Sequence, residues 1–468
     1  MRLRPAVAPL VAAMTSLALA ACSSAPAYNP PKIAAPARFK EVAGWTEAAP
    51  HDDAPRGDWW SVYQDPALDA LEQQALTASP TLAAALARYD QARAAARESE
   101  AALYPTVGIE GAAARARVSR NRPLTNGSAV TYDNYVGGGG VDYEIDLWGR
   151  VRASVAAGKA DAQASQADLA SARLSLQAAV ADAYFRLRGL DAQASLLASS
   201  VDAFGRAYDL TQRRHGGGIA SGIDVNRAAT VLGNARALVS AIASQRAATE
   251  HELAALTGAV ASQFALSPAP GDMIVPAIPA ATPSQLLERR PDIAAAERRM
   301  FAANVRIGVA RAAFYPSLNL GAAGGWQSTG AALLSAPSTF WALGPLSAAL
   351  TLFDGGKRKA QVRLSHAQYE EEAANYRETV LAAFRQVEDA AASIRHLAQQ
   401  AEAQQDAARA AERTSDIALS RYRDGASDYL EVVTAQTDAL TAQRSLISVQ
   451  TQRMQASIAL VKAMGGPA

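Results

Sequence analysis

The sequence contains two copies of one series of landmarks. The segment Leu103–Val107, with Tyr-Pro at its centre, returns 211 positions later as Phe314–Leu318. The segment Gly218–Val225 returns 207 positions later as Gly425–Val432. A period of roughly 200 residues is far longer than the repeat of a solenoid protein. We therefore expect a duplicated structural unit with two equivalent halves, which argues against a single asymmetric active-site cleft.

The N-terminus has the features of a secretion signal. The basic residues Arg2 and Arg4 precede an apolar stretch, Val7–Ala21, that ends in small residues. Cys22, the only cysteine, follows at once, and this arrangement resembles a bacterial lipobox, whose cysteine becomes the acylated N-terminus. Ser23 follows instead of aspartate, which by analogy with bacterial lipoproteins implies release to the outer membrane. The alternative is an ordinary signal peptide, with Cys22 incidental.

The charge balance and the composition limit the kinds of protein that this chain can be. Lys and Arg number 45 and Asp and Glu 44, so no basic surplus points to nucleic acid. Hydrophobic residues make up 50% of the chain, and much of this is alanine, which favours helix. Beyond residue 21 the sequence has no stretch of about 18 apolar residues, so we expect no transmembrane helix.

Catalytic and metal-binding patterns are missing from the sequence. The five histidines lie far apart, without the spacing of metal ligands. The glycines at 216–218 follow an expected helix and lack the Lys-Ser/Thr of a phosphate loop. We expect a conduit and not an enzyme, with no catalytic residue, no metal and no cofactor apart from a covalent lipid on Cys22.

Composition divides the chain into five parts. They are a lipoprotein signal peptide (1–21), a lipidated Pro-rich tether (22–57), a first repeat (58–257), a Pro-rich connector (258–284) and a second repeat (285–468). Each repeat should contain a helix, two strands and a long helical hairpin. The expected helices begin near Pro66 and cover 80–103, 149–215, 223–257, 291–313, 357–424 and 426–464. Two coiled-coil-like seams of apolar residues indicate that the long helices pack side by side.

The strands should be few and two-faced. Apolar residues alternate with acidic ones over 141–147, the pattern of a strand with one apolar and one acidic face. We expect partners at 106–118, 317–327 and 340–353, and an exposed loop at 119–133. Four strands per chain cannot close a membrane barrel, which needs at least about eight. Three chains would supply 12 strands, so we expect oligomerisation.

Motifs along the chain together resemble one protein family, the TolC-like outer-membrane factors of tripartite efflux systems, and most closely their NodT-type lipoprotein branch. The segments are Leu19–Cys22, Tyr28–Pro31, Trp59–Trp60, Asp65–Leu68, Tyr143–Arg150, Arg289–Ile293, Phe314–Ser317 and Leu352–Gly356. The resemblance implies a mainly α fold with a small β part. It implies a homotrimer whose 12-stranded β-barrel, set in outer-membrane lipid, is continued by a long periplasmic α-helical barrel. The implied partners are a periplasmic adaptor protein and a proton-driven inner-membrane pump.

The same resemblance places a gate around the two turns between long helices. The implied gate residues are Asp224, Tyr422, Asp428, Leu430 and Glu431. The turns themselves are the implied adaptor contact: Gly218, Ile219, Ala220, Ser221, Gly425, Ala426 and Ser427. The chain departs from the family pattern at Ser427, where TolC has a linking arginine, and at Thr434, where an acidic ring is common.

A structural interpretation of the same residues stays open. The arginines at 213, 214, 421 and 423 would complement helix C-termini, and Asp428 or Ser221 would cap the next helix.

The expected function is the outer-membrane channel of an efflux pump that exports drugs and toxic solutes, with a gate at the periplasmic helical tip. One alternative is an exit duct for proteins or peptides beside an ATP-driven inner-membrane transporter. A trimeric coiled-coil surface protein is a further alternative, but it explains neither the paired strands nor the duplication.

Overall fold

A computed structural model describes most of the chain and divides it into two compact units. The described residues are 25–31, 33, 39–41, 58–121, 127–271, 273–276, 289–329 and 338–466. The first unit contains the described residues within 1–32, 88–166 and 295–377, and the second those within 33–87, 167–294 and 378–468. Each unit therefore draws on both sequence repeats. The predicted signal peptide and Cys22 lie outside the described residues.

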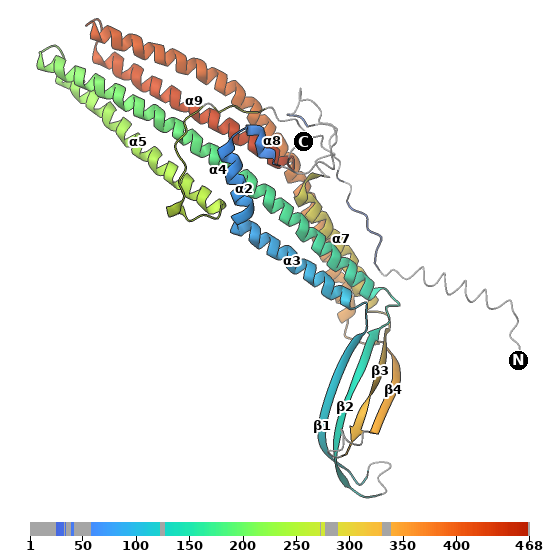
Figure 1. Cartoon of the computed structure of the whole chain (residues 1–468). Coiled ribbons are helices and arrows are strands. Elements are labelled where there is room, and N and C mark those ends of the chain that lie inside the picture. The colour runs from blue at the N-terminus through green and yellow to red at the C-terminus, as the bar shows by residue number, and fades with distance from the viewer. Residues whose placement is uncertain are drawn as a thin grey trace. The chain divides into compact units, whose positions relative to one another are not determined.

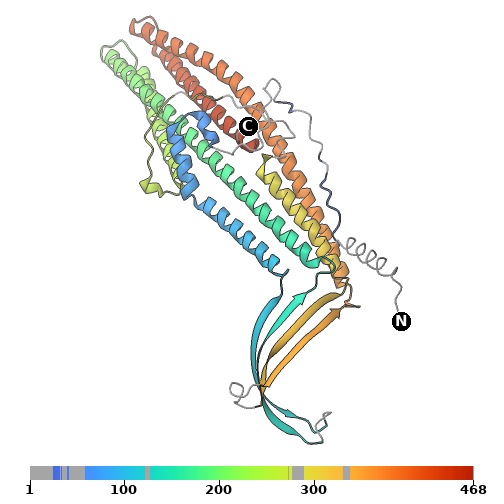
Figure 2. The same ribbon diagram turned by 45° about the vertical axis from the view of Figure 1, so that its right-hand side comes forward.

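The order and length of the helices repeat. In the first half α3 (Pro80–Ala101), α4 (Arg150–Gly216) and α5 (Gly222–Leu256) contain 22, 67 and 35 residues. In the second half α7 (Pro291–Ala312), α8 (Lys357–Arg423) and α9 (Tyr429–Ala463) contain 22, 67 and 35 residues again. Two strands stand between the short and the long helix of each half, and each long helix turns back as the next (Figures 1 and 2). The expected duplication is confirmed at the level of element order.

Four strands form one antiparallel sheet in the order β1-β2-β3-β4 (Figure 2). Their bounds are β1 Thr106–Val118, β2 Val130–Glu144, β3 Ser317–Ser328 and β4 Ser338–Ala349. Two expectations were wrong in extent. The loop predicted for 119–133 overlaps the first four residues of β2. The alternation over 141–147 overlaps only the last four residues of β2, Val141–Glu144. Four consecutive glycines at 137–140 have no side chains to alternate, which hid the rest of the strand. The strand predicted for 340–353 ends at Ala349.

The register gathers most of the large apolar side chains on one face of the sheet, although that face also carries the ion pair of Arg115 with Asp133, and Phe340 lies on the other face. Side chains alternate across a strand, so paired residues share a face. Val107 pairs with Val141, and the same face carries Ile109, Trp326 and Trp341. Ile109 is 92% exposed and Trp341 is 82% exposed in the single chain. The opposite face carries Glu110, Asp142, Asn134 and Gln327, and the last two share a hydrogen bond of 2.7 Å.

Glycines allow β2 and β3 to approach closely. A Cβ added at Gly138 would lie 2.6 Å from the carbonyl oxygen of Gly324, and one at Gly325 would lie 2.4 Å from that of Gly137. A Cβ added at Gly108, on the same face of β1, would meet nothing within 4 Å. The contact between the two middle strands therefore requires glycine at 138 and 325, whereas position 108 has room for a side chain in the single chain.

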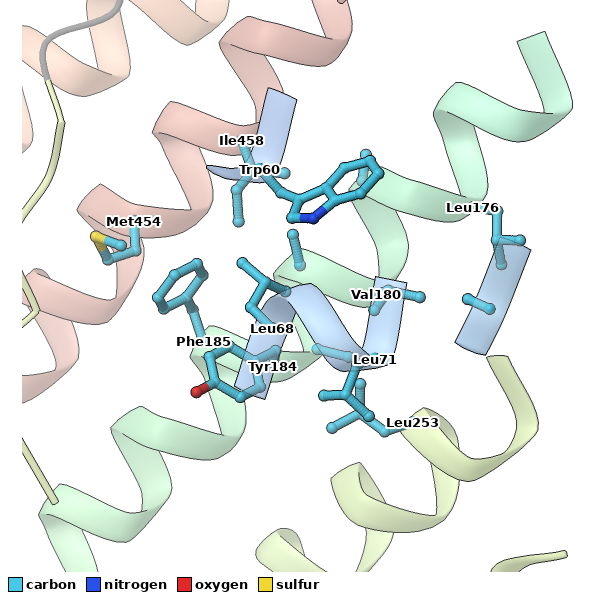
Figure 3. Packing of buried hydrophobic residues seen from close by; sticks show 14 of the residues in the cluster. Trp60, Leu68, Leu71, Leu176, Val180, Tyr184, Phe185, Leu253, Met454 and Ile458 are labelled. Atoms are coloured by element: carbon cyan, nitrogen blue, oxygen red, sulfur yellow. The ribbon is translucent and has the colours of Figure 1, made fainter. Parts of the chain in front are cut away.

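In the core of the second unit, two short helices near the start of the first repeat pack on the long helices. The 3-10 helix η1 (Trp59–Tyr63) and α2 (Pro66–Ala78) pack on α4, α5 and α9 through Trp60, Leu68 and Tyr184 (Figure 3). Asp65 caps α2 as expected, accepting hydrogen bonds from the main-chain N–H of Ala67 and Leu68. Burial of each large apolar side chain contributes about 1.5–3 kcal/mol, so this cluster is a main source of stability.

A buried ionic network fixes the connector that follows α5 and contains the short helix η2 (Ala261–Gln263). The carboxylate of Asp191 accepts hydrogen bonds from Arg246 at 2.7 Å, Arg188 at 3.0 Å and the main chain of Ala269 at 3.1 Å. Arg246 also donates to the carbonyl of Leu266 at 2.6 Å. The connector is therefore held to both α4 and α5.

The described pieces of the N-terminal tether are pinned as well. In the first unit Tyr28 donates a hydrogen bond to the Glu297 carboxylate at 2.7 Å and packs edge-on against Phe301. In the second unit Phe39 is buried against Phe384, and the next two main-chain N–H groups both donate to Glu388 at 2.8 Å. Neither piece forms a helix or strand, yet each is docked on one of the helices α7 and α8.

None of the helices in the described ranges combines the length and apolarity required of a membrane-spanning helix.

Candidate functional site: the turns of the helical hairpins

The two turns between long helices share one backbone design. After α4, Gly218 adopts a φ of +74° and the N–H of Ile219 donates to the Arg214 carbonyl at 2.8 Å. After α8, Gly425 adopts a φ of +77° and the N–H of Ala426 donates to the Arg421 carbonyl at 2.8 Å. Both helices thus end in a left-handed glycine that satisfies the last carbonyls. This requirement explains why glycine recurs at the predicted turns.

The returning helices begin with side-chain caps. Ser221 is the N-cap of α5 and forms a capping box with Asp224. Asp428 is the N-cap of α9 and accepts a hydrogen bond from the main-chain N–H of Glu431 at 3.1 Å. The predicted capping role of Ser221 and Asp428 is confirmed. Asp224 and Asp428, two of the predicted gate residues, therefore stabilise the turns of their own hairpins.

Two buried tyrosines join the hairpins beside these turns. Tyr422 of α8 is 4% exposed and Tyr429 of α9 is 2% exposed, and their rings meet edge-on at 5.2 Å. They belong to one cluster with Ala207 of α4 and Ala228 of α5. The phenol of Tyr422 lies 3.4 Å from the hydroxyl of Thr211, within hydrogen-bond reach. Residues from all four long helices therefore meet at this cluster.

The surroundings of Tyr429 keep its phenol neutral. Burial above all, together with Tyr422 and Asp224 nearby, raises the pKa of Tyr429 to about 12. A protonated phenol can donate a hydrogen bond throughout the physiological pH range.

Arg214 approaches Tyr422 from the first hairpin. Its guanidinium donates a hydrogen bond to the Tyr422 carbonyl and lies 4.5 Å from the centre of the Tyr422 ring. The Nε atom of Arg214 and the Oγ atom of Ser427 are both buried and have no hydrogen-bond partner among the described residues.

Several of the other predicted site residues lie on the surface of the single chain. Leu430 is 46% exposed, and Glu431 forms an ion pair of 3.4 Å with Arg421 of its own hairpin. Ile219, within the first turn, is 70% exposed. The structure thus brings Tyr422 into a buried cluster, whereas Leu430, Glu431 and Ile219 are exposed. Whether they form a gate depends on an assembly, and the gate stays a prediction.

Sequence reasoning missed Tyr429 and the role of Arg214 in this cluster. Tyr429, Val432, Gln436 and Ala439 are all buried at spacings of 3, 4 and 3, the pattern of a helical seam. That seam was a signal that Tyr429 faces inward. The contact between Arg214 and Tyr422 has no comparable signal, because the two residues are 208 positions apart.

In the part of the chain that the structure describes, no three His, Cys, Asp or Glu side chains are placed to hold a metal ion.

Comparison with known protein families identifies the family to which this chain belongs. The sequence profile described as outer membrane efflux protein matches residues 71–259 and 282–466. The chain belongs to the outer membrane efflux protein family. Its predicted membership and its TolC-like fold are confirmed, and it is an outer-membrane protein.

Relatives of this outer membrane efflux protein cover nearly its whole length. It is 32% identical over 458 residues to the probable efflux pump outer membrane protein TtgC of Pseudomonas putida, spanning 97% of this chain and 94% of that one. It is 32% identical to the pyoverdine export outer membrane protein OpmQ of Pseudomonas aeruginosa, spanning 96% and 95%. Among solved structures, the outer-membrane channel OprN superposes with a TM-score of 0.87 at 27% identity, covering 95% of this chain and 99% of OprN. The open state of the MtrE outer membrane channel of Neisseria gonorrhoeae superposes with a TM-score of 0.81 at 28% identity, covering 95% and 98%.

Proposed function

We propose that this protein is the outer-membrane exit channel of a tripartite efflux pump and exports small molecules such as drugs and toxic solutes. The observation that carries the proposal is the two-faced sheet, whose register sets Val107, Ile109 and Trp341 against Glu110 and Asp142 on the other face. Such a sheet suits lipid on one side and water on the other. Family membership supports the same conclusion.

We infer that the working form is a homotrimer. In the single chain β1 and β4 are the outer strands of the sheet, and an exposed sheet edge readily pairs with another chain. Four strands are too few to close a barrel, whereas three copies supply 12. In this assembly β4 of one copy pairs with β1 of the next, and the long helices form the periplasmic tunnel.

The proposal includes a lipid anchor on Cys22, which the lipobox-like sequence supports. The docked residues around Tyr28 and Phe39 would then connect the anchor to α7 and α8.

The proposed partners are a periplasmic adaptor protein and a proton-driven inner-membrane pump. The turns at Gly218–Ser221 and Gly425–Ser427 are the proposed adaptor contact, and the exposed Ile219 offers it an apolar side chain. In the trimer Asp224, Tyr422, Asp428, Leu430 and Glu431 would recur three times around the axis and form the gate.

We infer no catalytic activity. The functions for which TtgC and OpmQ are named, efflux and pyoverdine export, favour small solutes over secreted proteins.

Conductance of the purified protein tests the proposal, with two glycine variants as a matched pair. Gly138→Ala places a Cβ against the backbone of β3, whereas Gly108→Ala places one in open space on the same face. We expect the wild type and Gly108→Ala to form trimers that give stepwise currents in planar lipid bilayers, and Gly138→Ala to lose them. A folded monomer with native strand content and no current would overturn the proposal.

A further inference from the structure

We propose that the end of the β1–β2 hairpin away from the helices binds the phosphate groups of lipopolysaccharide, the anionic lipid of the outer leaflet, through Arg115 and Arg117. This inference deepens the proposed channel function and rests on it. With the helices in the periplasm, the opposite end of the sheet lies at the cell surface.

The β1–β2 hairpin continues beyond the four-stranded part of the sheet. β3 pairs with β2 only between Tyr135 and Glu144. The pairing of β1 with β2 continues further, to Val118 and Val130. The segments Ala114–Val118 and Val130–Asn134 therefore form a two-stranded extension (Figure 2). Since β1 begins after α3 and β2 ends before α4, the extension is the end of the hairpin away from these helices.

Aromatic side chains mark the level at which the extension begins. Tyr135, Trp326 and Trp341 lie on the sheet face that carries Val107 and Ile109, which we call the outer face. Trp326 is 50% exposed and Trp341 is 82% exposed in the single chain. Aromatic residues concentrate where the apolar band of an outer-membrane barrel meets the polar headgroups. The extension follows directly after Tyr135, so it begins at headgroup level.

The charged side chains of the outer face all lie on this extension. In the described strands they are Arg115, Arg117 and Asp133. Arg115 lies 3.7 Å from the Asp133 carboxylate, yet its side chain remains 76% exposed. Arg117 is exposed, and its side chain has no hydrogen-bond or ion-pair partner among the described residues. The extension therefore presents a net positive charge and one guanidinium that is available to a ligand.

The chemistry of these side chains fits a lipid phosphate. A guanidinium donates two parallel hydrogen bonds to phosphate oxygens, and a basic residue near an anionic membrane surface gains affinity for it. Lipopolysaccharide carries its phosphates next to its acyl chains, at the level where the extension begins. The phospholipids of the inner leaflet would meet the opposite end of the sheet. The level of the two arginines thus favours lipopolysaccharide over a phospholipid.

Lipid titration of the full-length trimer in detergent tests the proposal, with bound lipopolysaccharide measured by native mass spectrometry. Replacing both arginines, Arg115→Ala with Arg117→Ala, should weaken binding by about tenfold or more. The control, Arg93→Ala with Arg97→Ala, removes two exposed arginines from α3 and should leave binding within about twofold of wild type. Asp133→Asn should tighten binding by about twofold or more, because it frees Arg115 from its ion pair.

The ligand is tested separately from the residues. Lipopolysaccharide stripped of its phosphates should bind the wild type about tenfold more weakly than the intact lipid. Equal binding of the two forms would overturn phosphate recognition. Phosphatidylglycerol that competes as well as lipopolysaccharide would overturn the choice of lipid and leave a surface for any anionic headgroup.

The outcomes also separate this site from the channel. Equal binding by the wild type and the Arg115 and Arg117 double variant would overturn the site and leave the arginines as charges that protect a strand edge. An equal loss in the Arg93 and Arg97 control would overturn it as well. Wild-type trimers that give no current in planar bilayers would instead contradict the proposed function. If the double variant does not assemble, Arg117→Ala alone decides, because this change leaves no partner in the chain unpaired.

Discussion

Ser221 and Asp224 cap each other at the start of α5. The hydroxyl of Ser221 accepts a hydrogen bond from the main-chain N–H of Asp224 at 3.2 Å, and the Asp224 carboxylate accepts from the Ser221 hydroxyl at 2.8 Å and its main-chain N–H at 3.2 Å. Each side chain satisfies a main-chain donor that the helix leaves free. The predicted gate carboxylate thus has a structural role inside one chain, and any role in gating must be separated from it.

Paired variants make that separation. Asp224→Ala and Ser221→Ala both break the capping box, and each should lower stability by about 1 kcal/mol in thermal unfolding followed by circular dichroism. Only Asp224→Ala also removes the carboxylate, so only this variant should raise channel conductance. Equal conductance in the two variants would leave Asp224 as a helix cap and remove it from the gate.

The Asp191 network should be the most sensitive polar site in the second unit. Asp191→Ala leaves Arg188 and Arg246 without their buried acceptor, and we expect a loss of about 3 kcal/mol in the free energy of unfolding. The matched control is Asp406→Ala, which removes an exposed carboxylate paired with Arg409 and should cost less than about 0.5 kcal/mol. Denaturant titrations of both variants measure the difference. Similar losses would show that the connector does not depend on Asp191.

Glu72 should make stability fall as pH rises. Its side chain is fully buried, and neither carboxyl oxygen has a hydrogen-bond partner among the described residues. Burial above all, with Asp58 and Asp69 nearby, raises the pKa of Glu72 to about 9. Between the unfolded pKa, near 4.5, and about 9, the folded chain binds a proton that the unfolded chain has lost. Each pH unit in this window therefore costs about 1.4 kcal/mol.

Glu72→Gln tests this pH dependence. The variant should match the wild type near pH 5, exceed it in melting temperature at pH 8, and lose most of the slope between. Melting temperatures at several pH values provide the measurement. Parallel curves for the wild type and the variant would show that Glu72 titrates as an ordinary carboxylate.

The docked tether should respond to one carboxylate of α8. Glu388→Ala removes the acceptor of the Lys40 and Glu41 main-chain N–H groups, and their hydrogen exchange should accelerate by about tenfold or more. Glu378→Ala, at an exposed position of the same helix, is the control and should leave both rates unchanged. Unchanged exchange in both variants would show that Glu388 does not hold the tether.

The helices could be predicted closely from the sequence, and the strands less well. Proline and glycine mark helix ends because they remove a donor or allow a left-handed turn, so Pro66, Pro291 and Gly425 fixed boundaries that the structure reproduces. The start of β2 was missed because the glycines at 137–140 interrupt the alternation from which a strand is recognised. The capping roles of Ser221 and Asp428 follow from local residue types and spacing. The contact of Arg214 with Tyr422 does not, because it depends on how two hairpins pack.

The central claim is that this chain is the exit channel of an efflux pump, and dye accumulation in living cells tests it most directly. The measurement compares steady-state fluorescence of an exported dye in a host that lacks its other channels of this family, with and without this protein. The account predicts that loss of the protein raises accumulation, that wild type and Gly108→Ala restore export, and that Gly138→Ala does not. Equal accumulation in the presence and absence of the wild-type protein, with its adaptor and pump expressed, would contradict the account.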